Sequence, residues 1–424
     1  MGSQPQGASM ALHQFSRDFI TRCITQQTAY ETLTRLCDEV GSRPSGSDEE
    51  RRATELAAEL MSKAGLDVTI SEFSYSGWER GSTVVTLSAK GSGDTIPAYP
   101  LGFCPPADLT APVVDVGTGS EQEFTASEVK GKIALVSSAT ARNTPSLHRS
   151  RKYELAVAAG AAGFAFYLDK PGGLTVMGSA RLDATGCGSI PAVGLTYEDA
   201  MRAKRDTSAT MRIVSECRGM DVVSTNAIGY KRGESSEEIV VCGHIDTWFS
   251  PGAVDNGSGV AAVLELARLL ERYNLRRSIR FITFGSEEIG ILGSKAYVDA
   301  NPDLSAVRLV LNLDCPAIKD GRLTITTNEN ARLYDFFDGL GRELNLDLEL
   351  HPERLYHSDH AHFREKGIPS AQFLAGSEQF AFAHTAYDTL DKIEAASFTV
   401  PLLVAGVAII ACAMGSDVEF DAHD

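Results

Sequence analysis

The stretch from Glu238 to Leu270, EIVVCGHIDTWFSPGAVDNGSGVAAVLELARLL, decides the fold. Its first apolar run, Ile239 to Cys242, has the length and β-branched character of a strand buried on both faces. Its last third has the apolar pattern of a helix. The loop between them carries His244, Asp246 and Asp255. An imidazole and two carboxylates therefore lie where a strand ends and a helix begins, which is where ligands bind in an open α/β sheet.

This loop has the residue types of a metal site. One imidazole and several carboxylates suit a hard to borderline divalent cation such as zinc. Taken alone, the loop is explained equally well as a surface turn that carries polar residues. The remainder of the chain has to decide between the two interpretations.

Length and charge narrow the class of protein. A chain of 424 residues exceeds what one hydrophobic core usually supports, so we expect two domains. The net charge of −17 argues against a nucleic-acid partner, because no basic stripe faces a phosphate backbone. We interpret the acidic surface as an aid to solubility.

The chain changes character twice, which predicts the domain organisation. Strand patterns alternate with helical patterns in residues 1–80 and 216–424, which predicts an α/β domain with a mixed, mostly parallel sheet flanked by helices. Residues 81–215 contain short strands spaced by turn residues, and we interpret them as a β-rich accessory domain inserted into the first. Its strand candidates are STVVTLSA, APVVDVG, KIALVSS, AGFAFYL and IPAVGLT.

Two helical patterns open the α/β part, Tyr30 to Val40 and Asp48 to Ala64, separated by GSRPSGS. Ser45 or Ser47 is expected to cap the second helix, and the acids of its first turn complement the helix dipole. Those acids are Glu49 and Glu50.

Cysteine usage and the two ends of the chain bear on location. Eight scattered cysteines without a CxxC pair indicate free thiols in a reducing compartment. The amino terminus has no basic segment followed by an apolar core, so we expect a cytoplasmic protein, or a secreted one if that end has been shortened.

The apolar run Val400 to Met414 is shorter than the roughly 20 residues of a spanning helix. We therefore predict a buried carboxy-terminal helix and no membrane partner.

Three further sequence blocks carry ligand-type residues just past an apolar strand or in a turn-rich loop. They contain the pair Glu287 and Glu288, then Asp314, and last His384. Two zinc ions roughly 3.5 to 4 Å apart need a bridging carboxylate, with an imidazole and another carboxylate on each side. With Asp255 as the bridge, the candidate residues satisfy that count. A further carboxylate, which is not a ligand, must take the proton of the attacking water. Adjacent Glu287 and Glu288 offer both roles, and Asp246 is placed to hydrogen-bond the imidazole. The expected pairs are His244 with Asp314 and Glu288 with His384.

These blocks also carry a resemblance. HID, GAVDNGSG, GSEEIGILGS, LNLD, SDHAHF and HTAYDTLDKI resemble the successive motifs of the co-catalytic di-zinc aminopeptidase family, which includes bacterial leucyl aminopeptidases, glutamate carboxypeptidase II and the transferrin receptor. The resemblance covers residues from about 25 to 80 and 216 to 415. It implies the zinc-exopeptidase fold, two zinc ions, Asp255 as bridging ligand and Glu287 as general base. It also implies a cis peptide bond between Asp255 and Asn256, and the terminal ligands His244, Glu288, Asp314 and His384.

The inserted segment resembles the protease-associated domain of the larger members, chiefly in FTASEVKGKIALVSS, KYELAVAAGAAGFAFYL and SIPAVGLTYEDA. In the family this domain lies beside the active site and can narrow access to it or contribute to substrate choice. Relatives that contain it are commonly homodimers, so we expect a homodimer by analogy.

One departure concerns the residue that stabilises the oxyanion. Some relatives place a Tyr before the last His ligand, whereas this chain has Ala383. Tyr356, His357 and His360, around the SDH motif, are alternative donors, and each is equally well explained as a structural residue.

The leading hypothesis is a zinc-dependent exopeptidase, and first an aminopeptidase that removes the N-terminal residue of peptides by means of a water bridging the two metals. A carboxypeptidase or dipeptidase of the same family is the nearest alternative. A non-catalytic binding module of the transferrin-receptor kind should have lost ligands, and here all five are present. A single-zinc cyclase acting on amino-terminal glutamine would differ in metal stoichiometry.

Overall fold

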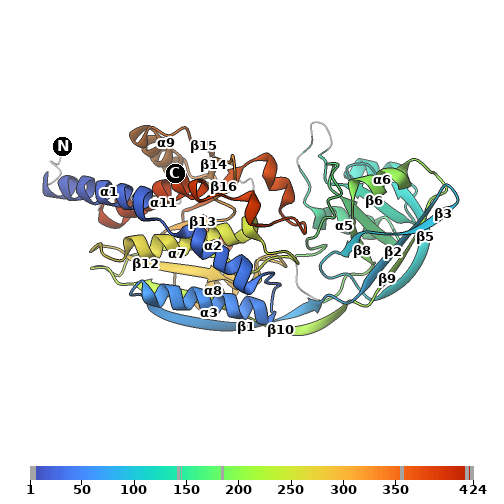
Figure 1. Cartoon of the computed structure of the whole chain (residues 1–424), viewed down its shortest axis with the longest axis horizontal. Coiled ribbons are helices and arrows are strands. Elements are labelled where there is room, and N and C mark those ends of the chain that lie inside the picture. The colour runs from blue at the N-terminus through green and yellow to red at the C-terminus, as the bar shows by residue number, and fades with distance from the viewer. Residues whose placement is uncertain are drawn as a thin grey trace.

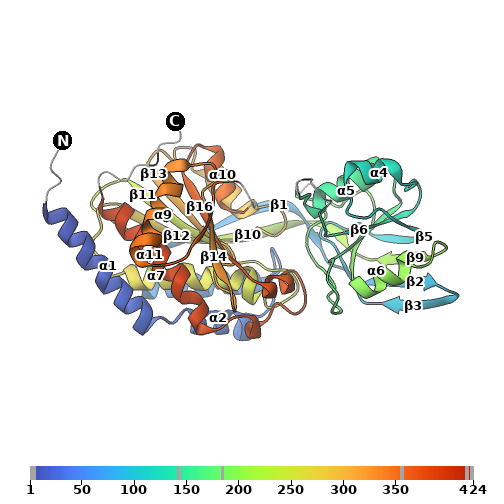
Figure 2. The same cartoon turned by 90° about the horizontal axis from the view of Figure 1, so that it is seen from above.

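The computed structural model of the chain describes residues 6–140, 144, 146–182, 186–353, 358–415 and 420. They form two eight-stranded sheets. Two long strands, β1 (Asp67–Glu79) and β10 (Arg218–Lys231), pair antiparallel over their shared length and run from the first sheet towards the second (Figures 1 and 2). The chain enters the second sheet after β1 and returns through β10.

The first sheet has the order β1-β10-β12-β11-β13-β16-β14-β15. The central pairings, from β12 through β11 and β13 to β16, are parallel, whereas β10 and β14 pair antiparallel with their central neighbours. The predicted mixed sheet with a parallel centre is confirmed. Its remaining strands are β11 (Glu238–His244), β12 (Ser278–Phe284), β13 (Val307–Leu313), β14 (Arg322–Thr326), β15 (Glu349–His351) and β16 (Ser370–Gly376).

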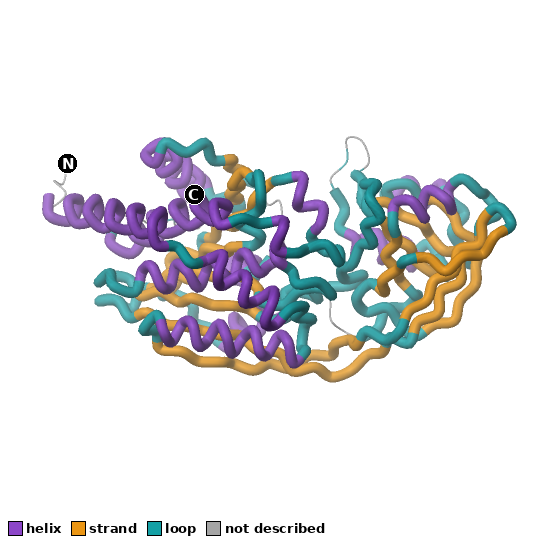
Figure 3. Tube along the Cα trace, in the orientation of Figure 1, coloured by secondary structure: helices purple, strands orange, loops and turns teal. Residues whose placement is uncertain are grey.

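Helices cover both faces of this sheet (Figure 3). The larger apolar core lies on one face, where some helices pack on the buried strands and others pack on those helices. That face carries α1 (Gln6–Gln26), α2 (Ala29–Arg35), α3 (Asp48–Lys63), α7 (Ser258–Leu270), α9 (Ala331–Leu344) and α11 (Thr399–Met414). The other face carries α8 (Leu292–Ala300) and α10 (His360–Glu365).

Short helical turns complete the first part. They are π-helical turns at Leu36–Val40 and Ala253–Gly257, and 3-10 turns at Glu378–Phe382, Leu390–Lys392 and Ala395–Phe398. The helix expected over Tyr30 to Val40 is therefore divided into α2 and the π-helical turn that follows it.

Helix α11 is the predicted carboxy-terminal core helix. Together with the turn before it, it is the one stretch of the described residues that is long and apolar enough to cross a membrane. Its most apolar window is 67% buried inside the protein. The predicted burial is confirmed.

The second sheet lies within residues 83–215 and has the order β3-β2-β9-β5-β6-β7-β8-β4. Apolar clusters lie on both of its faces. Its elements are β2 (Thr83–Ala89), β3 (Ser92–Ile96), β4 (Ala98–Pro100), β5 (Ala107–Asp115), β6 (Ile133–Ser137), β7 (Gly163–Tyr167), β8 (Ala192–Leu195), β9 (Thr210–Ser215), α4 (Glu121–Ala126), α5 (Arg149–Ala158) and α6 (Tyr197–Lys204).

A buried apolar seam joins the two parts beside the loops that follow β11 and β12. Phe103 and Met177 of the inserted part pack with Trp248 and Ile289 of the first part. The Met177 N–H also donates to the carbonyl of His384 at 2.7 Å. The inserted part is thus held directly against the loop that carries a predicted ligand.

Candidate metal centre

The predicted ligands gather at one edge of the first sheet. His244 is the last residue of β11, Asp314 follows β13, and Glu288 lies in the loop after β12. These strands are parallel, so their carboxyl ends meet at the same edge. Asp255, in the turn before α7, and His384, after a 3-10 turn, reach the same place.

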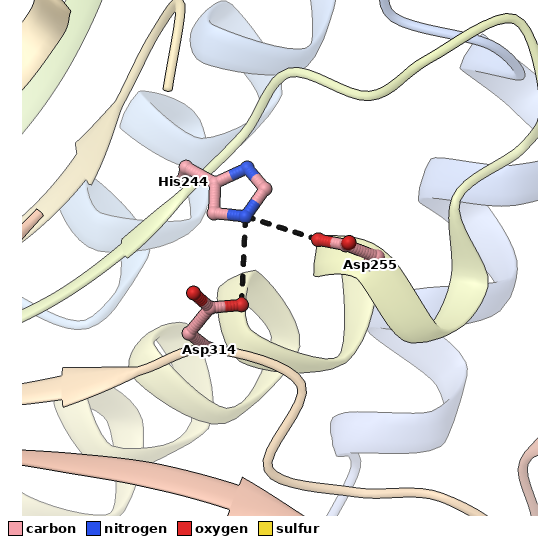
Figure 4. Close-up of side chains that lie close together, drawn as sticks. All are labelled: His244, Asp255 and Asp314. Carbon is pink, nitrogen blue, oxygen red and sulfur yellow. Dashed lines mark ion pairs between the residues drawn. The ribbon is translucent and has the colours of Figure 1, made fainter. Parts of the chain in front are cut away.

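Two groups of side chains meet there, each with its ligand atoms within 4.8 Å of one another. In the first group, His244 Nε2 lies 3.1 Å from Asp255 Oδ1 and 3.6 Å from Asp314 Oδ1 (Figure 4). In the second group, His384 Nε2 lies 3.1 Å from Asp255 Oδ2 and 2.9 Å from Glu288 Oε2. Each oxygen of Asp255 therefore serves one imidazole, which is the geometry of a bridging carboxylate.

The turn that carries Asp255 is held by its surroundings. The peptide bond between Asp255 and Asn256 is cis, as the resemblance implied. Asp388 accepts the N–H groups of Val254 and Asp255 at 2.7 and 3.0 Å. The Asn256 amide donates to the Leu313 carbonyl at 3.0 Å. The carboxylate predicted to bridge is thus fixed relative to β13.

Burial within the site is uneven. The side chains of His244 and Glu288 are 2% and 5% exposed, whereas that of His384 is 27% exposed. The site therefore opens on the side of His384, beside the inserted part.

Both imidazoles sit among carboxylates. Burial lowers the pKa of His384, but Glu288 and Asp255 outweigh it and raise the pKa to about 10. Burial likewise opposes protonation of His244, yet Glu287 and the other acids nearby raise its pKa well above the ordinary value. The site attracts positive charge strongly.

The donor set fits a pair of divalent cations. Asp255, Glu288 and Asp314 converge on the two imidazoles, and carboxylates so close together repel one another unless cations lie between them. Glu288 Oε1 is buried and has no hydrogen-bond partner, although buried polar atoms are normally paired. Nitrogen and oxygen donors of this kind are those that zinc takes in catalytic sites.

Asp246 contacts more than the imidazole of His244. The closest approach to the His244 Nδ1 is the Asp246 backbone carbonyl at 3.2 Å, with the carboxylate at 3.5 Å. The carboxylate also accepts the N–H groups of Glu287 and Glu288 at 2.9 and 3.1 Å. Asp246 therefore orients the predicted base and a predicted ligand as well as the imidazole.

Glu287 stands apart from both groups of ligands. It is half-buried, and burial raises the pKa of its carboxyl group well above the ordinary value, opposed by His244 and reinforced by Asp314 and Glu288. A carboxyl group with a raised pKa beside the ligands has the properties of a general base.

Of the three alternative oxyanion donors, the structure describes His360. Tyr356 and His357 lie outside the described residues. His360 is fully buried on α10, with its Nδ1 3.4 Å from the Asn312 amide nitrogen. Ala383 precedes His384, as the sequence indicated.

Sequence reasoning missed the contribution of residues 41–50. Ser45 Oγ donates to Asp246 Oδ2 at 2.7 Å. Arg43 is fully buried and donates to carbonyls of the loop between His244 and Asp255, at Ile245, Pro251 and Gly252. The signal in the sequence was the polar GSRPSGS between two helices, but periodicity cannot show which loop it contacts. Asp388 was present in a quoted motif without a predicted role.

Comparison with known proteins identifies the family. The model of peptidase family M28 matches residues 226–402, and that of the PA domain matches residues 109–203. Aminopeptidase YwaD of Bacillus subtilis (strain 168) is 32% identical over 86% of this chain and 80% of that protein. The chain belongs to peptidase family M28.

Other M28 proteins agree along most of the chain. Carboxypeptidase Q of Homo sapiens is 27% identical over 89% of this chain and 84% of that protein. The solved structure of BSAP, a zinc aminopeptidase from Bacillus subtilis, covers 93% of this chain and 96% of its own, with a TM-score of 0.72 and 29% identity. M28 is the family of co-catalytic zinc exopeptidases, so the resemblance and the fold inferred from it are confirmed. The protein is a metallopeptidase.

Proposed function

We propose that this M28 peptidase is a zinc-dependent aminopeptidase that removes the amino-terminal residue of peptides. The observation that carries the proposal is the carboxylate of Asp255, whose two oxygens each lie 3.1 Å from a different imidazole. That arrangement supplies two neighbouring metal positions with one shared ligand.

The distances support two sets of ligands. His244, Asp314 and one oxygen of Asp255 would hold one zinc ion, and His384, Glu288 and the other oxygen would hold the second. Bound zinc supplies a Lewis acid for the scissile carbonyl and lowers the pKa of the attacking water.

Glu287 moves the proton in this proposal. Its N–H is fixed by Asp246 at 2.9 Å, so its side chain starts from a defined position next to the ligands. It takes the proton of the attacking water and passes it to the leaving amine. Burial raises the pKa of this carboxyl group, which favours its acceptance of the proton from the water.

The names of the relatives support the aminopeptidase. YwaD and BSAP are both named aminopeptidases, and YwaD is more similar to this chain than carboxypeptidase Q is. The exopeptidase class is common to all of them.

A panel of aminoacyl chromogenic amides, each beside its N-acetylated twin, tests the proposal. We expect hydrolysis of the free amines only, loss of that hydrolysis after chelation, and recovery when zinc is restored. The N-acetylated compounds are the internal control for the free amine. A silent panel from a protein that holds two zinc ions would reject the aminopeptidase, and dipeptides with free carboxylates would then be the substrates to assay.

Arg149 favours the carboxypeptidase or dipeptidase as a second candidate. It begins α5 of the inserted part and is half-buried, with its Nε donating to the Ser179 carbonyl at 2.9 Å. Its guanidinium covers Gly178, where any side chain would overlap it. Burial lowers its pKa to about 10, and the Glu288 carboxylate opposes that effect, so the group is a cation near the ligands. A cation there suits the free carboxylate of a short peptide.

Arg149→Ala measures that contribution. If Arg149 binds the substrate carboxylate, kcat/KM for dipeptides should fall roughly 10- to 100-fold, the value of a hydrogen bond to a charged group. Hydrolysis of aminoacyl amides, which have no carboxylate, should change much less. Arg151→Ala is the matched control, since Arg151 lies on the same helix but is exposed and pairs with Glu121 and Glu154. Equal losses on both substrate types would remove the carboxylate-binding role.

We also propose that the enzyme works in a reducing compartment, as expected for a cytoplasmic protein, and that it forms a homodimer. All eight cysteines are free, which supports the reducing compartment. The homodimer rests on analogy with relatives that contain the inserted domain.

A further inference from the structure

The loop after β12 is held by an unusual set of hydrogen bonds. Four consecutive backbone N–H groups, from residue 285 to residue 288, each donate to a buried side chain from another part of the chain. The two later bonds go to Asp246, as described above. The two earlier bonds run from Gly285 to Asn226 Oδ1 at 3.0 Å and from Ser286 to Glu50 Oε1 at 2.9 Å.

The contacts of the Glu50 carboxylate differ from those that its sequence position predicts. It is the third residue after Ser47, the cap of α3, and its own N–H donates to Ser47 Oγ at 3.1 Å. In a capping box its carboxylate would return to the Ser47 N–H. That N–H instead donates to the Pro44 carbonyl, and the Glu50 carboxylate bonds Gly46, β10 and the loop after β12.

The surroundings of Glu50 form a set of donors matched to its carboxylate. Glu50 is 1% exposed. Its Oε2 accepts the Gly46 N–H at 2.7 Å and the Ser224 hydroxyl at 2.9 Å, while Oε1 accepts the Ser286 N–H. A buried carboxylate is costly to the fold, so its retention here calls for a reason beyond packing.

The loop is shaped to reach Glu50. Ser286 has a φ of 56°, in the left-handed region that residues other than glycine rarely adopt. A Cβ on Gly285 would lie 2.8 Å from Glu50 Oε1 and 2.4 Å from Ser224 Oγ, so only glycine lets the strand end pass over this carboxylate. Backbone of this kind persists only where the surroundings hold it.

We propose that Glu50 is a positioning residue for the general base: it fixes the Ser286 N–H and thereby sets where Glu287 and Glu288 leave the sheet. Asp246 holds the N–H groups of Glu287 and Glu288, and Glu50 holds that of Ser286. The inference rests on the proposed function, because it assigns Glu50 to the peptidase reaction of the same site.

Three variants test the assignment in the full-length zinc enzyme. Glu50→Ala removes the acceptor, and Glu50→Asp keeps the charge on a stem too short to span from Gly46 to Ser286. Glu50→Gln keeps an oxygen that can accept the Ser286 N–H. Thr54→Val is the matched control, because Thr54 is fully buried on the same helix and its hydroxyl bonds Thr225 of β10 at 3.1 Å and the Glu50 backbone carbonyl at 3.0 Å, so the change leaves the Glu50 carboxylate in place.

We expect kcat to fall about 10- to 100-fold in Glu50→Ala and Glu50→Asp, the effect typical of a residue that orients a functional group, with KM within threefold. Glu50→Gln should recover most of the lost kcat. Thr54→Val should lower the thermal midpoint but keep kcat within twofold. If Glu50→Ala does not fold, Glu50→Asp carries the comparison.

Two results would overturn the assignment: unchanged kcat in Glu50→Asp, or a loss in Glu50→Asp that Thr54→Val shares. If the wild-type protein hydrolyses no peptide, the proposed function fails, and zinc affinity measured by competition with a chromophoric chelator decides instead. Weaker zinc binding in Glu50→Asp than in Thr54→Val supports the positioning of Glu288, and equal binding in both rejects it.

Discussion

Glu287→Gln should lower kcat by roughly 10³- to 10⁴-fold, at the upper end of what a general base contributes, and leave the zinc content at that of the wild type. The amide has the shape of the carboxyl group but cannot take a proton from water. Its backbone N–H still donates to Asp246, so the loop keeps its position. Neither group of ligand atoms includes Glu287, and so the metal positions stay intact.

Glu288 cannot replace the lost base. Its Oε2 lies 2.9 Å from His384 Nε2, which commits this carboxylate to the second ligand group. The variant therefore separates a base from a ligand in two adjacent residues of the same type. KM should change little, because the substrate carbonyl and amine keep their partners.

The measurement is steady-state hydrolysis of the preferred aminoacyl amide, with zinc per chain determined on the same sample. Glu378→Gln is the control, since Glu378 is an exposed acid six residues before His384. Wild-type activity in Glu287→Gln would contradict its role as the base. Loss of zinc together with activity would instead make Glu287 a ligand.

The parts of the fold that the sequence predicted are those set by local pattern. β11 and β13 are apolar runs of the length of buried strands, and parallel strands bring the residues at their carboxyl ends to one edge. That rule alone brings His244 and Asp314 together, because each directly ends or follows such a strand. The turn before α7 then adds Asp255.

The parts that could not be predicted depend on contacts between distant segments. The sequence predicts that Glu50 is a first-turn acid of α3, and only the folded chain shows that it accepts the N–H of Ser286, 236 residues away. The Ser45 bond to Asp246 spans 201 residues. No hydrophobic period encodes either contact, since both join polar groups that lie far apart in the sequence. The same holds for Arg149, whose proposed contact with a substrate depends on the packing of the inserted part against the His384 loop.

Asp255→Ala should remove both zinc ions, whereas Asp314→Ala should remove one. Asp255 is the one carboxylate shared by the two ligand groups, with an oxygen 3.1 Å from each imidazole. Without it, each zinc position keeps one imidazole and one other carboxylate. Asp314 belongs to the His244 group alone, so its loss leaves Asp255, Glu288 and His384 in place.

The turn itself should survive the change at position 255. Asp388 holds it through the backbone N–H groups of residues 254 and 255, which alanine retains. A loss of metal can therefore be assigned to the missing carboxylate, not to a displaced loop. The loss of affinity should exceed the roughly 10- to 100-fold that a supporting residue typically contributes.

Zinc per chain after dialysis and the thermal shift on adding zinc together measure this effect. A ligand at 1,000 times its Kd stabilises the folded state by about 4 kcal/mol, so wild-type protein should gain a large shift in Tm. Asp314→Ala should keep one zinc and part of the shift, and Asp255→Ala should show neither. Two retained zinc ions in Asp255→Ala would mean that the ions do not share this carboxylate, and the bridged arrangement on which the proposed peptidase rests would have to be abandoned.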